Sequence, residues 1–155
     1  MQPGRPAGVA MALELADSLM QEHRRLDLLV GQLESRVNAG INTGLMGLAR
    51  GLYDELRRTL ERHLDFEEKV VFPEFERLDA HGMELTAGLR SERAVLRRLL
   101  VDLGFELAGG EMINALASLA DMREVMGPHL AVEERIVFPA LAGTRTAARE
   151  RPTGT

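Results

Sequence analysis

The chain has 155 residues, of which 45% are apolar and 4% aromatic, and it carries a net charge of −5. This length suffices for one domain with a buried core, and the absence of cysteine excludes disulfides, thiolate metal sites and cysteine nucleophiles. The modest negative charge gives no reason to expect a nucleic-acid partner. No segment approaches the roughly 18 apolar residues of a membrane span, so we expect no membrane partner and take a cytoplasmic location as the default.

The first expected helix follows a flexible N-terminal arm over residues 1–10, where prolines and glycines do not favour packing. From about Met11, apolar residues recur at steps of three and four, the spacing of one helix face. This apolar stripe contains one histidine among aliphatic residues: Leu19, His23, Leu26, Val30, Leu33 and Val37. Residues 38–44 have the composition of a turn and are expected to end the helix.

The second expected helix has a stripe that contains His63, Glu67 and Val70. Pro73 should end or kink this helix nearby, because proline lacks the amide hydrogen and its ring collides with the preceding turn. Residues 79–82 form the next break.

The third expected helix carries apolar residues from Leu85 to Leu107, with Arg93 among them. Glycine is common just past a helix end, so Gly109-Gly110 is expected to stop it.

The fourth expected helix has a stripe that contains His129, Glu133 and Ile136. Gly127-Pro128 should bend this helix one turn before the histidine. Residues 143–155 have no apolar stripe and are expected to form a disordered tail.

Four amphipathic helices joined by short turns predict an all-α, up-down-up-down antiparallel four-helix bundle over residues 11–142. The bundle has an internal two-fold repeat. Segment 63–73 reappears as 129–139, with seven identical positions that include the His, both Glu, the Phe and the Pro. In the other two helices, Arg93 aligns with His23.

The duplicated segments predict a metal site. His63 with Glu67, and His129 with Glu133, are spaced four residues apart and so lie on one helix face. His23 lies within an apolar stripe. Buried ionisable groups are costly unless they are paired, protonated or bound to a metal. Two carboxylates and three neutral imidazoles suit iron, manganese or zinc, and paired carboxylates can also bridge two metal ions.

Packing alone is a sufficient explanation for each of these residues taken singly. A His-x-x-x-Glu pair is a common helix contact, and it is the duplication that favours metal binding. Glu68 and Glu134 lie one position further round the helix and are expected in solvent. Phe72-Pro73 and Phe138-Pro139 are expected to pack and to end helices, and His81 is expected on the surface.

Together these motifs resemble the hemerythrin-like family, the HHE cation-binding domains, over about residues 12–142. The matching motifs are Glu22-His23, His63-x-x-x-Glu67 before Phe72-Pro73, and His129-x-x-x-Glu133 before Phe138-Pro139. The resemblance implies a non-haem di-iron centre inside the bundle. It implies that His23 and His63 hold one iron, that His129 helps to hold the other, and that Glu67 and Glu133 bridge them.

The chain departs from this family at Arg93, where helix three usually supplies another histidine to the second iron. A guanidinium is not a metal ligand. Three outcomes are open: a second iron held weakly with water in the vacant position, a single metal with Arg93 supplying a positive charge, or loss of metal binding with Arg93 neutralising Glu67 and Glu133. Alternatively, the Arg93 side chain extends out of the bundle and touches none of these groups.

The expected function is that of a cytoplasmic non-haem iron protein with one or two iron ions, which binds or senses O2 or a related ligand such as NO or peroxide. Iron oxidation or peroxide decomposition at the same site is the enzymatic alternative, because both need an open position on a redox metal. The remaining alternative is a metal-free interaction bundle with a degenerate site.

Overall fold

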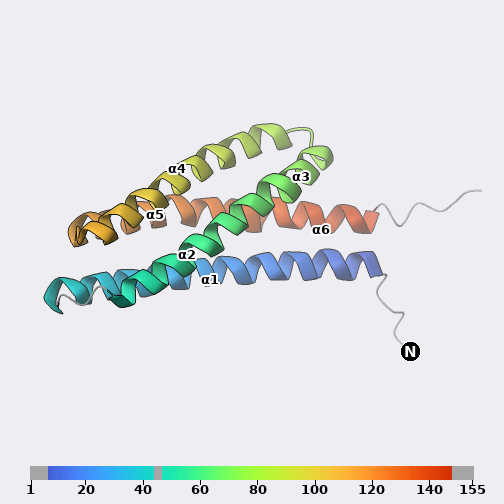
Figure 1. The fold of residues 1–155 in the computed structure, drawn as a ribbon. Helices are drawn as coiled ribbons and strands as arrows, with labels where there is room; N and C mark the ends of the chain where they lie inside the picture. Colours follow the sequence, from blue (N-terminus) through green and yellow to red (C-terminus); the bar gives the residue numbers. More distant parts are fainter. Residues whose placement is uncertain (1–6, 44–46, 148–155) are drawn as a thin grey trace, which may run out of the picture.

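The computed structural model describes residues 7–43 and 47–147, and nearly all of them are helical (Figure 1). The α-helices are α1 (Ala7–Thr43), α2 (Gly47–Phe66), α3 (Phe72–Leu78), α4 (Gly82–Gly109), α5 (Met112–Val132) and α6 (Phe138–Ala147). Two π-helical segments, η1 (Glu67–Val71) and η2 (Glu133–Val137), join α2 to α3 and α5 to α6. The chain therefore forms four helical rods, α1, α2–η1–α3, α4 and α5–η2–α6, and the predicted four-helix bundle is confirmed.

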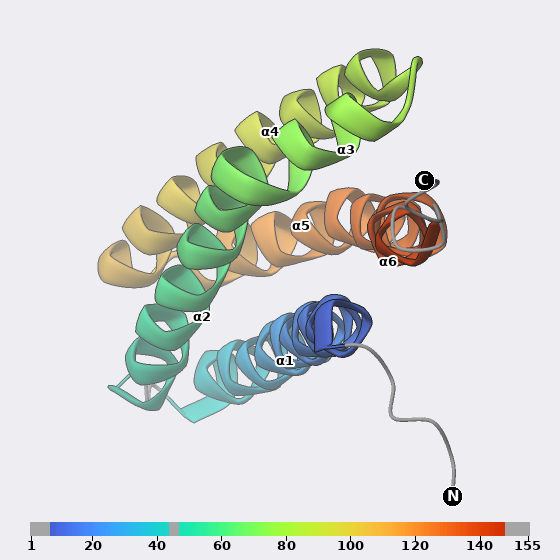
Figure 2. The same cartoon turned by 90° about the vertical axis from the view of Figure 1, so that its right-hand side faces the viewer.

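The rods pack as two helical hairpins. α1 contacts α2, α4 contacts α5, and α1 also packs along α5 and α6. Figure 2 shows the four rods from the end at which α3 turns into α4 and α6 ends. Gly110 adopts φ 73° and caps α4, which confirms the predicted stop, since glycine enters this left-handed region without steric cost.

The ends of the first and last helices differ from the prediction. Residues 38–43 are helical. Gly40, three residues after Val37, is buried on the same helix face, so the buried stripe continues through it. Packing of that face outweighs the low helix propensity of Asn and Gly. Residues 7–10 and 143–147 are also helical. The rest of the expected arm and tail, together with Gly44, lies outside the described residues.

The two π segments occur where a proline follows a phenylalanine. The amide of Phe72 donates to the carbonyl of Glu67, and that of Phe138 donates to Glu133, five residues back in each case. The proline that follows has no amide hydrogen, and in a regular α-helix its ring would collide with the carbonyl four residues before it. The wider π turn avoids this collision. The α-helix thus ends before Pro73 as predicted, but the rod continues.

Each π turn holds one extra residue and so shifts the inward face. Val71 and Val137 are buried, whereas Val70 and Ile136 are 43% and 46% exposed. The prediction that Val70 and Ile136 lie on the inner stripe is therefore wrong. Helix α5 continues through Pro128 without interruption.

A layer of polar side chains separates two apolar clusters. The larger cluster lies towards the α1–α2 and α4–α5 ends and includes Leu26, Leu64 and Leu96. The smaller one lies at the α3 and α6 end and includes Phe72 and Phe138. Each fully buried Leu or Phe contributes about 1.5–3 kcal/mol, so the apolar clusters hold the rods in place around the polar layer.

Candidate metal centre

Four buried side chains from three rods meet in the polar layer. They are His23 of α1, His63 of α2, and the first residues of the two π segments, Glu67 and Glu133. One ligand-type atom from each lies within 4.8 Å of the other three. The structure thus brings together four of the five residues predicted as ligands within the span of a single ion.

The atoms at this point are ring nitrogens and carboxylate oxygens. His23 Nε2 lies 3.1 Å from His63 Nε2 and 3.2 Å from Glu133 Oε2. His63 Nε2 lies 2.6 Å from Glu67 Oε1. A nitrogen–oxygen set of this kind matches the donors that divalent first-row metals prefer.

The fifth predicted ligand, His129 of α5, lies on the far side of the same two carboxylates. Its Nε2 is 3.4 Å from Glu133 Oε1 and 3.6 Å from Glu67 Oε2. Each carboxylate therefore presents one oxygen to the His23–His63 side and its other oxygen to the His129 side.

The carboxylates fit a bound cation because their oxygens lack hydrogen bonds. Within the described part of the chain, neither oxygen of Glu67 or Glu133 has a hydrogen-bond partner, and the same holds for His129 Nε2. Burying such groups without partners costs about 1–3 kcal/mol each, and more when they are charged. A cation between Glu67, Glu133 and the imidazoles satisfies several of these atoms at once.

A second set of carboxylates holds the histidine rings. His63 Nδ1 donates to Glu22 at 3.0 Å, His129 Nδ1 to Glu92 at 2.9 Å, and His23 Nδ1 to Glu134 at 2.8 Å. Outer carboxylates of this kind fix the tautomer, so that Nε2 is free to bind a metal, and they make the ring more basic.

These outer carboxylates were largely missed from the sequence. Glu134 was expected in solvent, and that prediction is wrong, because its carboxylate binds His23 across the bundle, 111 residues away in sequence. For two of them the sequence did carry a signal. Glu22 and Glu92 stand at matched places in the repeat, each immediately before the equivalent positions 23 and 93.

Arg93 is buried, with 8% of its surface exposed, so the alternative in which it extends out of the bundle is wrong. Its Nη2 donates to the carbonyl of Leu64 at 2.6 Å, and its Nη1 pairs with Glu68. Its Nε lies 3.6 Å from Glu67 Oε2. Glu68 also accepts from Arg90. Its side chain is 43% exposed, so it reaches solvent as expected, but it also pairs with two arginines.

Without a metal, protons occupy this centre. Burial alone would lower the pKa of His63, but the carboxylates of Glu133, Glu22 and Glu67 outweigh it and raise that pKa to about 11. The pKa of His129 is also raised, against the effect of its burial, chiefly by Glu67 and Glu133. Burial would raise the pKa of Glu67, yet the two histidines hold it well below its usual range.

Metal uptake should therefore release protons. A charged His63 stabilises the metal-free fold fully below pH 6.5, and this stabilisation is lost as the pH rises through about 11. A metal ion must displace that proton at neutral pH, so affinity for Zn²⁺ or Fe²⁺ should increase as the pH is raised from 6 to 9. Titration in weakly buffered solution with a pH indicator measures the release. Binding without proton release would contradict this assignment.

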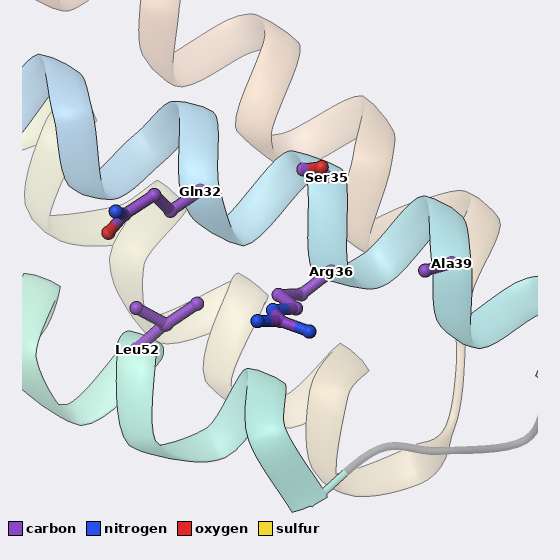
Figure 3. Close-up of a pocket in the computed structure, with 5 residues that line it drawn as sticks. All are labelled: Gln32, Ser35, Arg36, Ala39 and Leu52. Carbon is purple, nitrogen blue, oxygen red and sulfur yellow. The ribbon is translucent and has the colours of Figure 1, made fainter.

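A surface hollow of about 400 Å³ between α1 and α5 reaches the centre. Its lining includes His23 and Glu134 from the centre, together with Arg24, Arg123 and Gly127. The hollow is therefore the side from which an ion or a small ligand can approach His23. Another hollow, shown in Figure 3, lies between α1 and α2 and is lined by Gln32, Ser35, Arg36, Ala39 and Leu52, none of which belongs to the centre.

Filling the first hollow should slow binding without removing a ligand. A Cβ at Gly127 meets no atom within 4 Å, and Gly127 lines the hollow together with His23, so we expect the side chain of Gly127→Leu to fit on α5 and to narrow the approach to His23. We expect several-fold slower metal uptake with unchanged stoichiometry, measured by stopped-flow. Gly51→Leu is the matched control, because Gly51 is exposed on α2 and equally open. Equal rates for the two variants would contradict this role of the hollow.

The fold and the centre together define a helical bundle with a buried cluster of His and Glu side chains whose donor atoms lie close enough to share one cation. A family model described as Hemerythrin HHE cation binding domain matches residues 14–141, and the chain belongs to this family. No curated protein and no solved structure matched the chain in the corresponding searches. Among the described helices, none combines the length and apolarity that crossing a bilayer requires.

Proposed function

We propose that the protein is a cytoplasmic non-haem iron protein that binds or senses a small ligand such as O2, NO or peroxide. The observation that carries the proposal is the set of buried carboxylate oxygens of Glu67 and Glu133, which within the described residues lack hydrogen bonds and face imidazole nitrogens. Membership of the cation-binding family supports the same reading.

The residues of the chain prepare the site in three ways. His23 and His63 present Nε2 to the same point, and Glu134 and Glu22 hold these rings by Nδ1. The apolar clusters on both sides keep water away, which slows oxidation of the site by solvent. An iron ion bound there would supply a redox-active centre with an open position for the ligand.

The open position is expected on the side of the hollow beside His23. His23 is 3% exposed, and its ring also packs on Phe138 with centroids 5.3 Å apart. A diatomic ligand is small enough to approach through the hollow, whereas the packed clusters exclude larger molecules.

Anaerobic loading with Fe²⁺ tests the proposal. We expect stoichiometric iron by elemental analysis, and a new near-ultraviolet or visible band when air, NO or peroxide is admitted. Substoichiometric iron with no spectral change would contradict the proposal. Continued consumption of peroxide or Fe²⁺ beyond one equivalent would instead support the enzymatic alternative.

A further inference from the structure

The two halves of the bundle repeat their contacts as well as their sequence. Glu22 of α1 holds His63 of the second rod, and Glu92 of α4 holds His129 of the fourth rod in the same manner. The residue after each of these glutamates also has matched partners. His23 Nδ1 donates to Glu134 at the start of η2, and Arg93 Nη1 donates to Glu68 at the start of η1. Arg93 therefore occupies in the second half the place that His23 occupies in the first.

His23 and Arg93 occupy equivalent places, but only one of the two side chains can act as a metal ligand. His23 places a ring nitrogen 3.2 Å from Glu133 Oε2. Arg93 places Nε 3.6 Å from Glu67 Oε2, and in the described chain that Nε has no hydrogen-bond partner. A neutral imidazole can ligate a cation, whereas a guanidinium is permanently positive and cannot.

Arg93 is held firmly in this place. Leu64 and Glu68 fix its two terminal nitrogens, and the guanidinium lies 5.7 Å from the ring centroid of Phe72. Its side chain is only 10% exposed. The positive charge beside Glu67 is therefore a fixed part of the core.

From these contacts we infer that the centre takes one divalent ion, on the His23–His63 side, and that the Arg93 guanidinium replaces a second ion on the His129 side. The inference rests on the proposed metal binding and adds the number and the position of the ion. One divalent charge balances the two buried carboxylates of Glu67 and Glu133. A second divalent ion on the His129 side would meet the guanidinium and would lack the ligand that His23 provides in the first half.

The number of ions bound per chain tests the inference. Wild type and Arg93→His are loaded with Fe²⁺ without oxygen, freed of excess metal and measured by elemental analysis. We expect one ion per chain in the wild type and two in Arg93→His. Arg90→His is the matched control, because Arg90 pairs with the same Glu68 and lies over the same Phe72 ring. It should stay at one ion.

Two further variants test the position of the ion without the Arg93 substitution. His129→Gln should retain one ion, whereas His63→Gln should lose it, with helicity checked by circular dichroism in both. Two ions in the wild type, or loss of the ion from His129→Gln, would overturn the inference while leaving the proposed metal binding intact. Arg93→His that folds and still holds one ion would also overturn it. No ion in the wild type would overturn both.

Discussion

Glu67→Gln should lower the affinity for Fe²⁺ by 100-fold or more. Glu67 is the carboxylate that both sides of the centre share, with Oε1 2.6 Å from His63 and Oε2 3.6 Å from His129. The amide keeps the shape of the side chain but removes its charge and one of its two acceptor oxygens. A buried cation then keeps only the charge of Glu133 to balance it, and burying excess charge is costly.

Equilibrium dialysis with Fe²⁺ or Zn²⁺ measures this effect. Glu61→Gln is the matched control, because Glu61 lies on the same rod and pairs with Arg57 at the partly exposed surface. Such pairs contribute at most about 1 kcal/mol, so the control should bind metal as the wild type does. Comparable affinity in the two variants would remove Glu67 from the proposed ligand set.

Removing the metal should lower the melting temperature by about 10 °C. A ligand at about 1,000 times its Kd stabilises the folded state by about 4 kcal/mol, and about 1 kcal/mol corresponds to roughly 2–4 °C in a domain of this size. The stabilisation arises because metal binding satisfies carboxylate oxygens that are buried in the fold. Differential scanning calorimetry before and after chelation measures the shift.

The Glu67→Gln variant separates this effect from a general action of the chelator. At the same metal concentration a 100-fold weaker site retains about 1.4 kcal/mol of the stabilisation, so chelation should lower the melting temperature of the variant by less than half as much as that of the wild type. An equal drop in wild type and variant would place the stabilising ion elsewhere on the protein.

The helical bundle could be predicted from the sequence because its core is a set of regular apolar stripes. The steps of three and four from Leu19 to Val37 lie on one buried face of α1. Burial of such a face, rather than the propensity of single residues, decides helix formation. Burial also explains why the end of α1 was predicted too early. The buried stripe continues past Val37, where the composition indicated a turn.

The candidate ligands could be predicted because the sequence contains an internal repeat, whose two copies can be compared with each other. The duplication of His63-x-x-x-Glu67 as His129-x-x-x-Glu133 identified residues that packing alone does not require in both copies. The structure brings His63, Glu67 and Glu133 together with His23 around one point, and it places His129 beside the other oxygens of the same two carboxylates. Their role as ligands stays a prediction until metal is measured.

The register of the π segments could not be predicted from periodicity. A stripe counted at a fixed 3.6 residues per turn assigns Val70 and Ile136 to the core, whereas one extra residue per π turn moves Val71 and Val137 there. The signal was the proline after each phenylalanine, which favours a widened turn over a regular one.

The outer carboxylates could not be predicted because they act between helices. Glu134 reaches His23, and Glu68 reaches Arg93, from positions that a single helix assigns to its solvent side. Only the packing of the rods reveals such pairs. With the fold known, the two-fold relation of these contacts becomes visible, and Arg93 is the position at which the two halves differ.

The most direct measurement is anomalous diffraction at the iron edge from crystals loaded with Fe²⁺. We expect a peak inside the bundle, about 2.0–2.2 Å from Nε2 of His23 and His63, with oxygens of Glu67 and Glu133 completing the contacts. A peak only at surface carboxylates, or density that leaves these two histidines without a metal, would contradict the central claim.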